Sequence, residues 1–332
     1  GKMSDDLVSL FYRIDSSSYY KIALDVPSGF GYRADATVSF MCRKKEMYYP
    51  ENRRKCGDIF YHNPGFPEDE YYDSDTLLLT GDDYSVPSLN LYDYKNSRGH
   101  LFVFGGSLRY PGAPLISSLS AFHAGCGLVS LCSEKEVLDR VYNSHPSIMG
   151  VEKENIRKVK NNAFLIGPGW NDGDRELIEY AIESRKPLVI DADAIKLIER
   201  GHDFCSLAVL TPHLGEFRTL CSNLGIEEGD FYEKSRKVSE MLDAIIVIKT
   251  SVVWIFYKEK SYVYDGSNPS LGVAGSGDVL SGIIGAFLSR GMDPMESAIN
   301  GVILHQKCGK ALRERMGFYT SEDLIEEVGK ER

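Results

Sequence analysis

The strongest constraint on the fold is a regular alternation of short apolar runs with amphipathic segments, which begins near residue 100. The apolar runs have the length of strands, and the segments between them carry apolar residues at helical spacing. We predict strands at 101–104, 127–132, 163–166, 187–190, 207–210 and 244–248, followed by a hairpin of 252–257 and 261–264. We predict helices at 113–124, 134–142, 176–184, 216–222, 231–242, 278–289, 295–309 and 321–328. Strands that alternate with helices indicate an α/β fold whose mainly parallel sheet is covered on both faces.

The part of the chain before residue 100 is less regular. We predict two strands there, at 21–26 and 36–41. Residues 68–91 are acidic and polar, which is typical of a linker or a surface crossover. We therefore expect the boundary between two regions near residues 75–97.

The composition argues against several kinds of partner and location. The 332 residues carry a formal net charge of −10, which disfavours nucleic acid or an anionic membrane surface as the main partner. The start does not resemble a signal peptide, and no apolar run reaches the ~18 residues that suggest a membrane span. Seven cysteines without close paired spacing fit free thiols better than disulfides or a zinc site. We expect a cytoplasmic protein.

One glycine-rich loop is a candidate anion site. Gly275, Ser276 and Gly277 precede Asp278, which we place in the first turn of the predicted helix 278–289. The N-terminus of a helix has unpaired N–H groups and a partial positive charge, and glycines let a loop approach a phosphate closely. A carboxylate at this place could also take a proton from a nearby hydroxyl. The structural alternative is a glycine hinge with an acidic helix cap.

Glycine-rich or polar segments also follow the other predicted strands. They are 105–107, 167–169, 191–193, 211–216 and 249–251. Because ligands bind beyond the carboxyl ends of strands in open α/β sheets, we expect these segments to gather at one edge. Each alone fits a turn, a helix cap or a solvated strand end, so the functional interpretation depends on their coincidence. The chain shows no His or Cys cluster with metal-ligand spacing, no Ser-His-Asp signal, and neither the dinucleotide nor the Walker glycine pattern.

These segments, in this order and spacing, resemble a known family. The matching stretches are 105–113, 166–169, 191–194, 211–216 and 275–282. They are similar to the ADP/ATP-dependent NAD(P)H-hydrate dehydratases of the ribokinase-like superfamily. The resemblance covers residues 98–328 and implies a three-layer α/β/α fold.

The resemblance implies a cofactor-repair reaction on hydrated NADH or NADPH. Phosphorylation of the substrate hydroxyl would make it a good leaving group, and its loss would restore the nicotinamide double bond. Asp278 would act as the base, while the N–H groups of Gly275, Ser276 and Gly277 stabilise the transferring group. The residues implied to hold ADP or ATP, with Mg²⁺, are Lys249, Thr250, Ser251, Val252, Val253 and Gly277. The residues implied to face the hydrated cofactor are Ala113, Gly167, Gly169, His213 and Asp278.

The chain departs from the family pattern in the lysine loop. This loop usually reads Lys-Gly-x-x-Thr, and Thr250 and Val253 replace the glycine and the threonine here. The difference bears on nucleotide affinity and on the choice between ADP and ATP. Because relatives are usually tetramers, the resemblance also implies a homo-oligomer.

The front of the chain is similar to the end of the NAD(P)H-hydrate epimerase domain, in segments 23–29, 34–40 and 56–58. Asp25 and Ser28 match that domain's substrate and K⁺ positions. Residues 6–13 resemble the strand that should bear its catalytic aspartate, but no acid falls at the end, so we expect epimerase activity to be absent. The implied organisation is a partial, Rossmann-like α/β epimerase segment at 1–75, a linker at 76–97 and a dehydratase domain at 98–332.

Two other functions stay open at this point. A kinase of a small vitamin precursor, such as a hydroxymethylpyrimidine or a hydroxyethylthiazole, would use the same fold and the same aspartate. The other is a non-catalytic, nucleotide-binding scaffold whose front domain has decayed. The segments 211–216 and 105–107 favour the dehydratase over the kinase, and the intact loop before Asp278 argues against a decayed domain.

Overall fold

The computed structural model describes residues 4–65, 67, 74–86 and 88–331. The chain forms two compact units, Gly1–Leu77 and Leu78–Arg332. Within the described part, no helix is both long and apolar enough to span a membrane.

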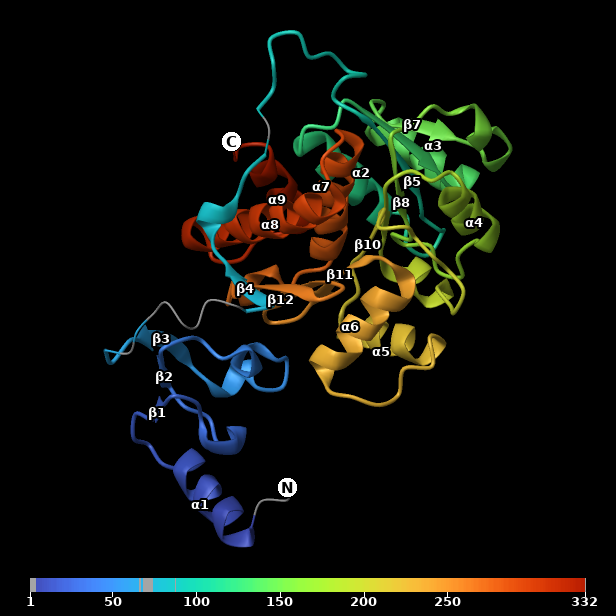
Figure 1. Ribbon diagram of the computed structural model, residues 1–332. Helices are drawn as coiled ribbons and strands as arrows, with labels where there is room; N and C mark the ends of the chain where they lie inside the picture. The colour runs from blue at the N-terminus through green and yellow to red at the C-terminus, as the bar shows by residue number, and fades with distance from the viewer. Residues whose placement is uncertain (1–3, 66, 68–73, 87, 332) are drawn as a thin grey trace. The chain divides into compact units, whose positions relative to one another are not determined.

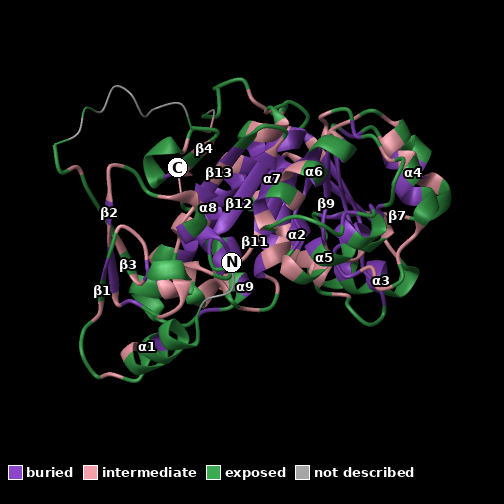
Figure 2. Cartoon of the chain, turned by 60° about the horizontal axis from the view of Figure 1, so that its bottom comes forward, coloured by how far each residue is buried: buried purple, intermediate pink, exposed green. Residues whose placement is uncertain are grey.

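The first unit is a small α/β arrangement. Helix α1 (Asp5–Asp15) precedes a parallel sheet of β1 (Ile22–Leu24), β2 (Ala36–Phe40) and β3 (Asp58–His62), in the order β1-β2-β3. Short 3-10 helices η1 (Ser28–Phe30), η2 (Lys45–Tyr48) and η3 (Arg53–Lys55) connect the strands. One face of the sheet is buried through Ala23, Thr37 and Ser39, so this unit has a core of its own (Figure 2).

The expectation that residues 6–13 form a strand is wrong, because they lie in α1. Ser4 caps the helix by accepting a hydrogen bond from the Leu7 N–H, and two aspartates occupy the first turn. Leu7, Phe11 and Ile14 recur at helical spacing, which a strand would split between two faces. The helical spacing of its apolar residues therefore predicts the conformation of this segment correctly, whereas the resemblance to an epimerase strand does not. The exposed strand β3 had not been predicted.

The second unit is built on a ten-stranded sheet of order β4-β13-β12-β11-β10-β9-β8-β5-β6-β7 (Figure 1). Its strands are β4 (Thr76–Leu79), β5 (His100–Phe104), β6 (Leu128–Cys132), β7 (Met149–Val151), β8 (Ala163–Ile166), β9 (Leu188–Ile190), β10 (Ala208–Leu210), β11 (Ile245–Lys249), β12 (Val253–Tyr257) and β13 (Lys260–Tyr264). All pairs from β7 across to β11 are parallel, whereas β11–β12 and β12–β13 are antiparallel. The prediction of a mainly parallel sheet is confirmed.

Helices cover both faces of this sheet. They are α2 (Ala113–His123), α3 (Lys135–Ser144), α4 (Arg175–Glu183), α5 (Leu214–Asn223), α6 (Phe231–Leu242), α7 (Ser276–Ser289), α8 (Pro294–Met316) and α9 (Ser321–Val328). Helices α2, α3, α7, α8 and α9 contribute to one hydrophobic cluster with the sheet. Aromatic residues of α4 and α6 contact rings of β8 and β12 on the other face. The result is the predicted three-layer α/β/α arrangement.

Strand β5 shows why both faces must be covered. Leu101 and Val103 point to the cluster of α2 and α7, and Phe102 and Phe104 alternate with them. All four side chains are fully buried. Helix α7 can approach closely because a Cβ at Gly285 would lie only 3.0 Å from Leu101. Continuous apolar runs of this kind are typical of parallel sheets.

Several bounds differ from the predictions. Helix α8 runs to Met316 instead of ending at 309, because Gly309 lies inside the helix where Leu271 packs against it. The three-residue strand β7 was not predicted, since its sequence Met-Gly-Val is partly exposed and forms no continuous apolar run like those of β9 and β10. Within the expected linker 76–97, the first four residues form β4 at the edge of the large sheet. Residues 68–73 of the acidic segment lie outside the described residues.

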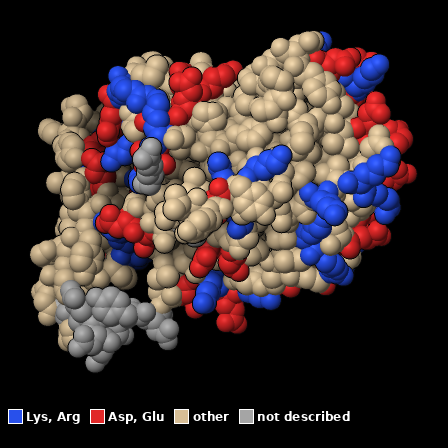
Figure 3. All heavy atoms as spheres, turned by 90° about the horizontal axis from the view of Figure 1, so that it is seen from above, with Lys and Arg blue, Asp and Glu red and all other residues tan. Residues whose placement is uncertain are grey.

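Charged side chains are mixed on the face of the molecule seen in Figure 3, where lysines and arginines lie among aspartates and glutamates.

Candidate functional site

The site is built where five neighbouring parallel strands end. Strands β11, β10, β9, β8 and β5 are adjacent and parallel, so the loops that follow them lie at one edge of the sheet. These loops carry the glycines and polar residues singled out in the sequence. Helix α7 begins at the same edge, because Gly277 in its first turn lies next to the Lys249 ammonium.

A glycine in the left-handed region starts α7. Gly275 has φ +87°, and a Cβ there would lie 2.8 Å from both Ile116 and Ser321. The N–H of Ser276 donates to the Val273 carbonyl at 3.2 Å, which closes a turn before the helix. Of the residues predicted for an anion hole, Ser276 therefore uses its backbone N–H in this turn. The N–H groups of Gly277 and of the next residue, Asp278, belong to the first turn of α7, which cannot pair them within the helix.

Asp278 is partly buried in that first turn. Burial raises the pKa of its carboxyl to about 7, the negative charge of Asp191 adds to this, and the Lys249 ammonium opposes it. Among the described residues, none forms a hydrogen bond or an ion pair with the Asp278 carboxylate. Such a group can accept a proton near neutral pH.

Lys249 and Asp191 form an ion pair beside α7. The Lys249 Nζ lies 2.8 Å from the Asp191 Oδ1, and the Thr211 hydroxyl donates to the same oxygen at 2.8 Å. Asp191 follows β9, Thr211 follows β10 and Lys249 ends β11, so three adjacent strands supply the group. A Cβ at Gly277 would lie 3.2 Å from the Lys249 Nζ, which places the ammonium against the start of α7.

The Lys249 side chain stays charged in this setting. Burial, the largest influence, would lower its pKa, but the carboxylates of Asp191 and Glu216 outweigh it and hold the pKa above the usual value. A fixed positive charge next to a helix N-terminus favours a phosphate.

His213 caps α5 and is held in one tautomer. Its Nδ1 accepts from the N–H groups of Gly215 and Glu216, at 2.9 and 3.3 Å. The hydrogen is therefore on Nε2, which lies 3.2 Å from the Glu216 carboxylate. The His213 side chain is 59% exposed, so a ligand can reach it. The Glu216 side chain is more buried, and this burial raises the pKa of its carboxyl.

The glycine loops after β5 and β8 are joined to each other. The Gly106 N–H donates to the Pro168 carbonyl at 2.8 Å, and the Ser107 hydroxyl donates to the Gly169 carbonyl at 2.9 Å. A Cβ at Gly169 would lie 3.0 Å from Ala113, which begins α2. Gly167 packs its Cα against the Asp191 carbonyl, where a side chain would collide. The predicted substrate-facing residues Ala113, Gly167 and Gly169 therefore lie together.

The predicted nucleotide loop has a compact structure of its own. The Thr250 hydroxyl donates to the Val252 carbonyl at 2.5 Å and accepts from the Val252 N–H at 3.3 Å. Val252 and Val253 are buried, and Val253 pairs with Lys249 as β12 begins. Only Ser251 has an exposed side chain in this loop. Any contact of Val252 or Val253 with a ligand would therefore come from the backbone.

Two groups near α7 were missed in the sequence. His305 of α8 places its Nε2 3.0 Å from both the hydroxyl and the carbonyl oxygen of Ser276. It lies in the middle of a predicted helix, so no sequence signal distinguishes it from a structural histidine. Asp191 and Thr211 belong to polar segments that the sequence places after two strands, but the meeting of Thr211 and Lys249 at the Asp191 carboxylate depends on the order of strands in the sheet.

Asp25 and Ser28, the two residues of the first unit that the sequence predicts for a site, have different surroundings. Asp25 has φ +66° and accepts a hydrogen bond from the Lys44 ammonium, which lowers the pKa of the Asp25 carboxyl. The same ammonium lies 2.6 Å from the Phe40 carbonyl and 3.4 Å from the Ser39 hydroxyl. Ser28 begins η1, where its carbonyl accepts from the Gly31 N–H. Lys44 had not been predicted.

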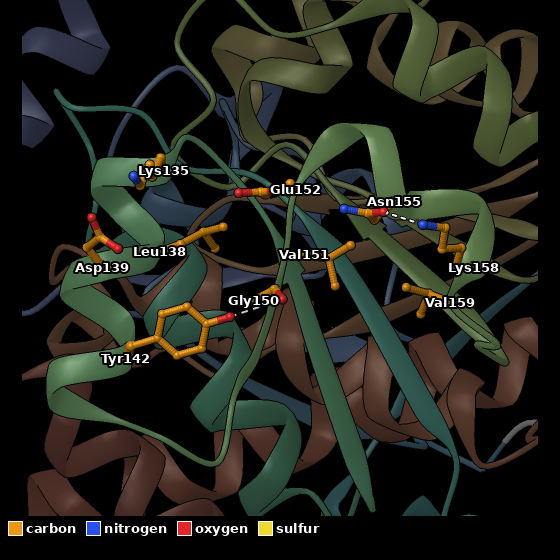
Figure 4. Close-up of a pocket in the computed structure, with 10 residues that line it drawn as sticks. All are labelled: Lys135, Leu138, Asp139, Tyr142, Gly150, Val151, Glu152, Asn155, Lys158 and Val159. Carbon is orange, nitrogen blue, oxygen red and sulfur yellow. Dashed lines mark hydrogen bonds between the residues drawn. The ribbon is translucent and has the colours of Figure 1, made fainter.

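A separate pocket of about 350 Å³ lies between α3 and β7, as Figure 4 shows. The Tyr142 hydroxyl donates to the Gly150 carbonyl at 3.1 Å, and Lys158 donates to the Asn155 side chain at 2.8 Å. The pocket contains none of the strand-end residues described above. Among the described residues, no group of three His, Cys, Asp or Glu side chains could hold a metal ion.

The chain is similar to known repair enzymes. The family model described as NAD(P)H-hydrate dehydratase matches residues 101–330. The ADP-dependent (S)-NAD(P)H-hydrate dehydratase of Neisseria meningitidis is 31% identical over 238 residues, which cover 68% of this chain and 80% of that protein. The bifunctional NAD(P)H-hydrate repair enzyme Nnr of Coxiella burnetii is 28% identical over 336 residues, which cover 93% of this chain and 68% of that protein.

Solved structures show the same fold. A ribokinase-like superfamily protein of Enterococcus faecalis matches with a TM-score of 0.68 and 24% identity, over 79% of this chain and 96% of that one. The ADP/ATP-dependent NAD(P)H-hydrate dehydratase of Bacillus subtilis, co-crystallised with ATP and Mg²⁺, matches with a TM-score of 0.67 and 21% identity, over 74% of this chain and 92% of that one. The expectation of a ribokinase-like fold is confirmed.

Proposed function

The chain belongs to the NAD(P)H-hydrate dehydratase family, and we propose that Asp278 is the general base of its reaction. One observation carries the proposal: the Asp278 carboxylate has no partner among the described residues, and its pKa of about 7 makes it a proton acceptor near neutral pH. The carboxylate lies in the first turn of α7, next to N–H groups that favour a phosphate.

In the proposed first step, Asp278 takes the proton of the substrate hydroxyl. The hydroxyl oxygen forms a bond to the terminal phosphorus of the nucleotide, and the bond from that phosphorus to the rest of the nucleotide breaks. The N–H groups of Gly277 and Asp278 stabilise the charge on the transferring group, together with the Lys249 ammonium that Asp191 holds.

In the proposed second step, phosphate leaves without further help from a side chain. The lone pair of the ring nitrogen expels it with the C–O bonding electrons, which leaves an iminium ion. The released phosphate or water then takes a proton from the adjacent carbon, the C–H bonding electrons form the double bond, and the nitrogen regains its lone pair. Ala113, Gly167 and Gly169 form the close-packed wall that the hydrated ring would face, since side chains at either glycine would collide with neighbouring groups. The exposed His213 ring, at the start of α5, would face the hydrated cofactor.

We propose ADP or ATP as the phosphoryl donor, held by the backbone of residues 249–253 and by Gly277 with its neighbouring ammonium. The fold neighbour from B. subtilis was crystallised with ATP and Mg²⁺, which supports this choice. Asp191 and Glu216 are engaged by Lys249 and His213, so of these three described carboxylates Asp278 is the one that could contact an ion. The site therefore fits Mg²⁺ carried mainly by phosphate oxygens and water, where the ion would neutralise phosphate charge.

For the first unit we propose a partial epimerase-like segment at residues 1–75 without epimerase activity, followed by a connecting segment at 76–97, whose first four residues form β4, and the dehydratase domain. The match to the bifunctional relative extends over 93% of this chain, which supports a shared origin of the front part. The Lys44 ammonium and the Phe40 N–H both contact the Asp25 Oδ1, so this oxygen is already engaged and would compete poorly for a substrate or K⁺.

The test is an assay of the purified protein with hydrated NADH and either ADP or ATP. We expect the near-ultraviolet absorbance of NADH to return only when a nucleotide is present. A protein that instead accumulates a phosphorylated pyrimidine or thiazole alcohol would be a kinase, and the proposal would fail. Inactivity with every donor, from a protein that binds ADP, would favour a non-catalytic nucleotide-binding role.

A further inference from the structure

A buried histidine from α8 holds the residue that begins α7. The Nε2 of His305 lies 3.0 Å from the Ser276 hydroxyl oxygen and 3.0 Å from the Ser276 carbonyl oxygen. The two residues are 6% and 5% exposed. Two contacts from one ring nitrogen restrain both the backbone and the side chain of Ser276.

The direction of these hydrogen bonds follows from the acceptors. A carbonyl oxygen can only accept, so the hydrogen of the His305 ring is on Nε2. Burial lowers the pKa of His305 to about 4, so the ring is neutral at physiological pH and has this single donor. Because the same N–H is shared with the Ser276 hydroxyl oxygen, the hydroxyl hydrogen is free to point elsewhere.

The position of Ser276 matters because Gly277 and Asp278 follow it directly. Gly275, on its other side, packs against Ile116 of α2 and Ser321 of α9. The loop is therefore held from α2, α9 and α8 before the helix begins. Donors that stabilise a transferring group act only when they are aimed correctly, and displacements near 1 Å can cost about 10²-fold in rate.

Building on the proposed function, we infer that His305 is a positioning residue, which holds Ser276 so that the N–H groups of Gly277 and Asp278 point at the transferring phosphoryl group. It touches neither the nucleotide nor the substrate in this role. His305 acts through the backbone of Ser276. Its loss should therefore change the direction of the Gly277 and Asp278 N–H groups and leave the contacts with the substrate in place.

The chain offers a matched control for a test of this role. His100, at the start of β5, contacts the Lys160 carbonyl at 2.6 Å and the Ser130 hydroxyl at 2.8 Å. It therefore makes the same two kinds of contact as His305, but at the opposite end of the parallel strands from the site. Replacement of either histidine by leucine removes one contact with a carbonyl and one with a hydroxyl, and only His305→Leu should disturb the start of α7.

The first measurement is steady-state kinetics with hydrated NADH. We expect His305→Leu to lower kcat about 10- to 100-fold with KM for hydrated NADH changed less than about threefold, because donors lose aim while substrate contacts persist. His305→Gln, whose amide N–H has a similar reach, should recover most of kcat. His100→Leu should keep kcat within about threefold of the wild-type value. Equal kcat values for the two leucine variants would overturn the inference.

The second measurement is calorimetric binding of ADP with Mg²⁺, which does not depend on turnover. We expect His305→Leu to weaken the Kd about tenfold and His100→Leu to leave it unchanged, since the misaimed N–H groups also contact the bound phosphates. An unchanged Kd in His305→Leu would contradict the inference. A wild-type protein that binds ADP but does not turn over hydrated NADH would sink the proposed function alone.

A third variant keeps the test decisive if His305→Leu does not fold. His305→Asn has the same amide as His305→Gln on a shorter side chain, which cannot reach Ser276. We expect the asparagine variant to lose at least about tenfold in kcat relative to the glutamine variant. Equal kcat values for these two variants would overturn the inference.

Discussion

Asp25 of the first unit and Asp278 of the second are both acids that the sequence assigned to a site, and their surroundings are opposite. Asp25 accepts from the Lys44 ammonium, and this contact lowers its pKa. Asp278 is partly buried without a partner among the described residues, and its pKa is raised to about 7. A paired carboxylate stays ionised and is a weak base, whereas a desolvated and unpaired one takes up a proton near neutral pH. The second setting is the one that a general base needs.

The largest expected effect comes from Asp278→Asn. If Asp278 is the general base, this change should lower kcat by about 10² to 10⁴. Asp25→Asn is the matched control, and its kcat should equal that of the wild-type protein. Both variants are measured by recovery of NADH absorbance at saturating nucleotide. Near-wild-type activity of Asp278→Asn would exclude the assigned role.

The two lysine–aspartate pairs should differ in what their loss costs. Lys249→Met leaves the buried Asp191 without its cation and should lower the free energy of unfolding by about 3 to 5 kcal/mol. Lys44→Met breaks a pair in which Asp25 is 47% exposed, so the loss should be at most about 1 kcal/mol. Urea unfolding of both variants measures the difference. Losses of equal size would show that the pair at the site is not desolvated.

Gly275 and Gly291 have nearly equal φ angles, so alanine substitutions at the two positions distinguish the cost of backbone strain from the cost of side-chain crowding. Gly275 has φ +87° and a crowded Cβ position, whereas Gly291 has φ +85° and open space. Gly291→Ala should cost about 1 to 2 kcal/mol from the left-handed backbone alone. Gly275→Ala should cost about 1 to 3 kcal/mol more, since Ile116 and Ser321 must shift. Thermal unfolding checks both values, and equal losses would contradict the crowding seen at Gly275.

The smallest effect is on pH dependence. Because Asp278 must be ionised to act as a base, we expect kcat to fall as the pH drops below about 7.

The raised pKa also means that this group favours the folded state below its unfolded pKa and loses that contribution as the pH rises through 7. Asp25, with a lowered pKa, contributes in the opposite sense: its stabilisation is present above the unfolded pKa and is lost on acidification. Urea unfolding of Asp278→Asn between pH 4 and 8 should therefore lack the decline that the wild-type protein shows.

Much of the second unit could be predicted because its signals are local. Strand β8 and helices α6 and α9 begin and end where the apolar pattern does. The first unit was harder, since its strands are short and partly exposed. There the resemblance suggested a strand at 6–13, while the spacing of Leu7, Phe11 and Ile14 fits the helix that forms. The strand β7 has three residues at the edge of the sheet and carries no period at all.

The sequence by itself determined the succession of strands and helices along the chain and the polar residues that follow each strand. Both depend on hydrophobic periods and turn residues within a few positions. Only the tertiary structure decided how those residues pair. Lys249 meets Asp191 across 58 positions, and His305 meets Ser276 across 29. These contacts depend on the order of strands in the sheet and on the packing of α8 against α7. They leave Asp278 without a partner among the described residues, and its chemistry follows from that.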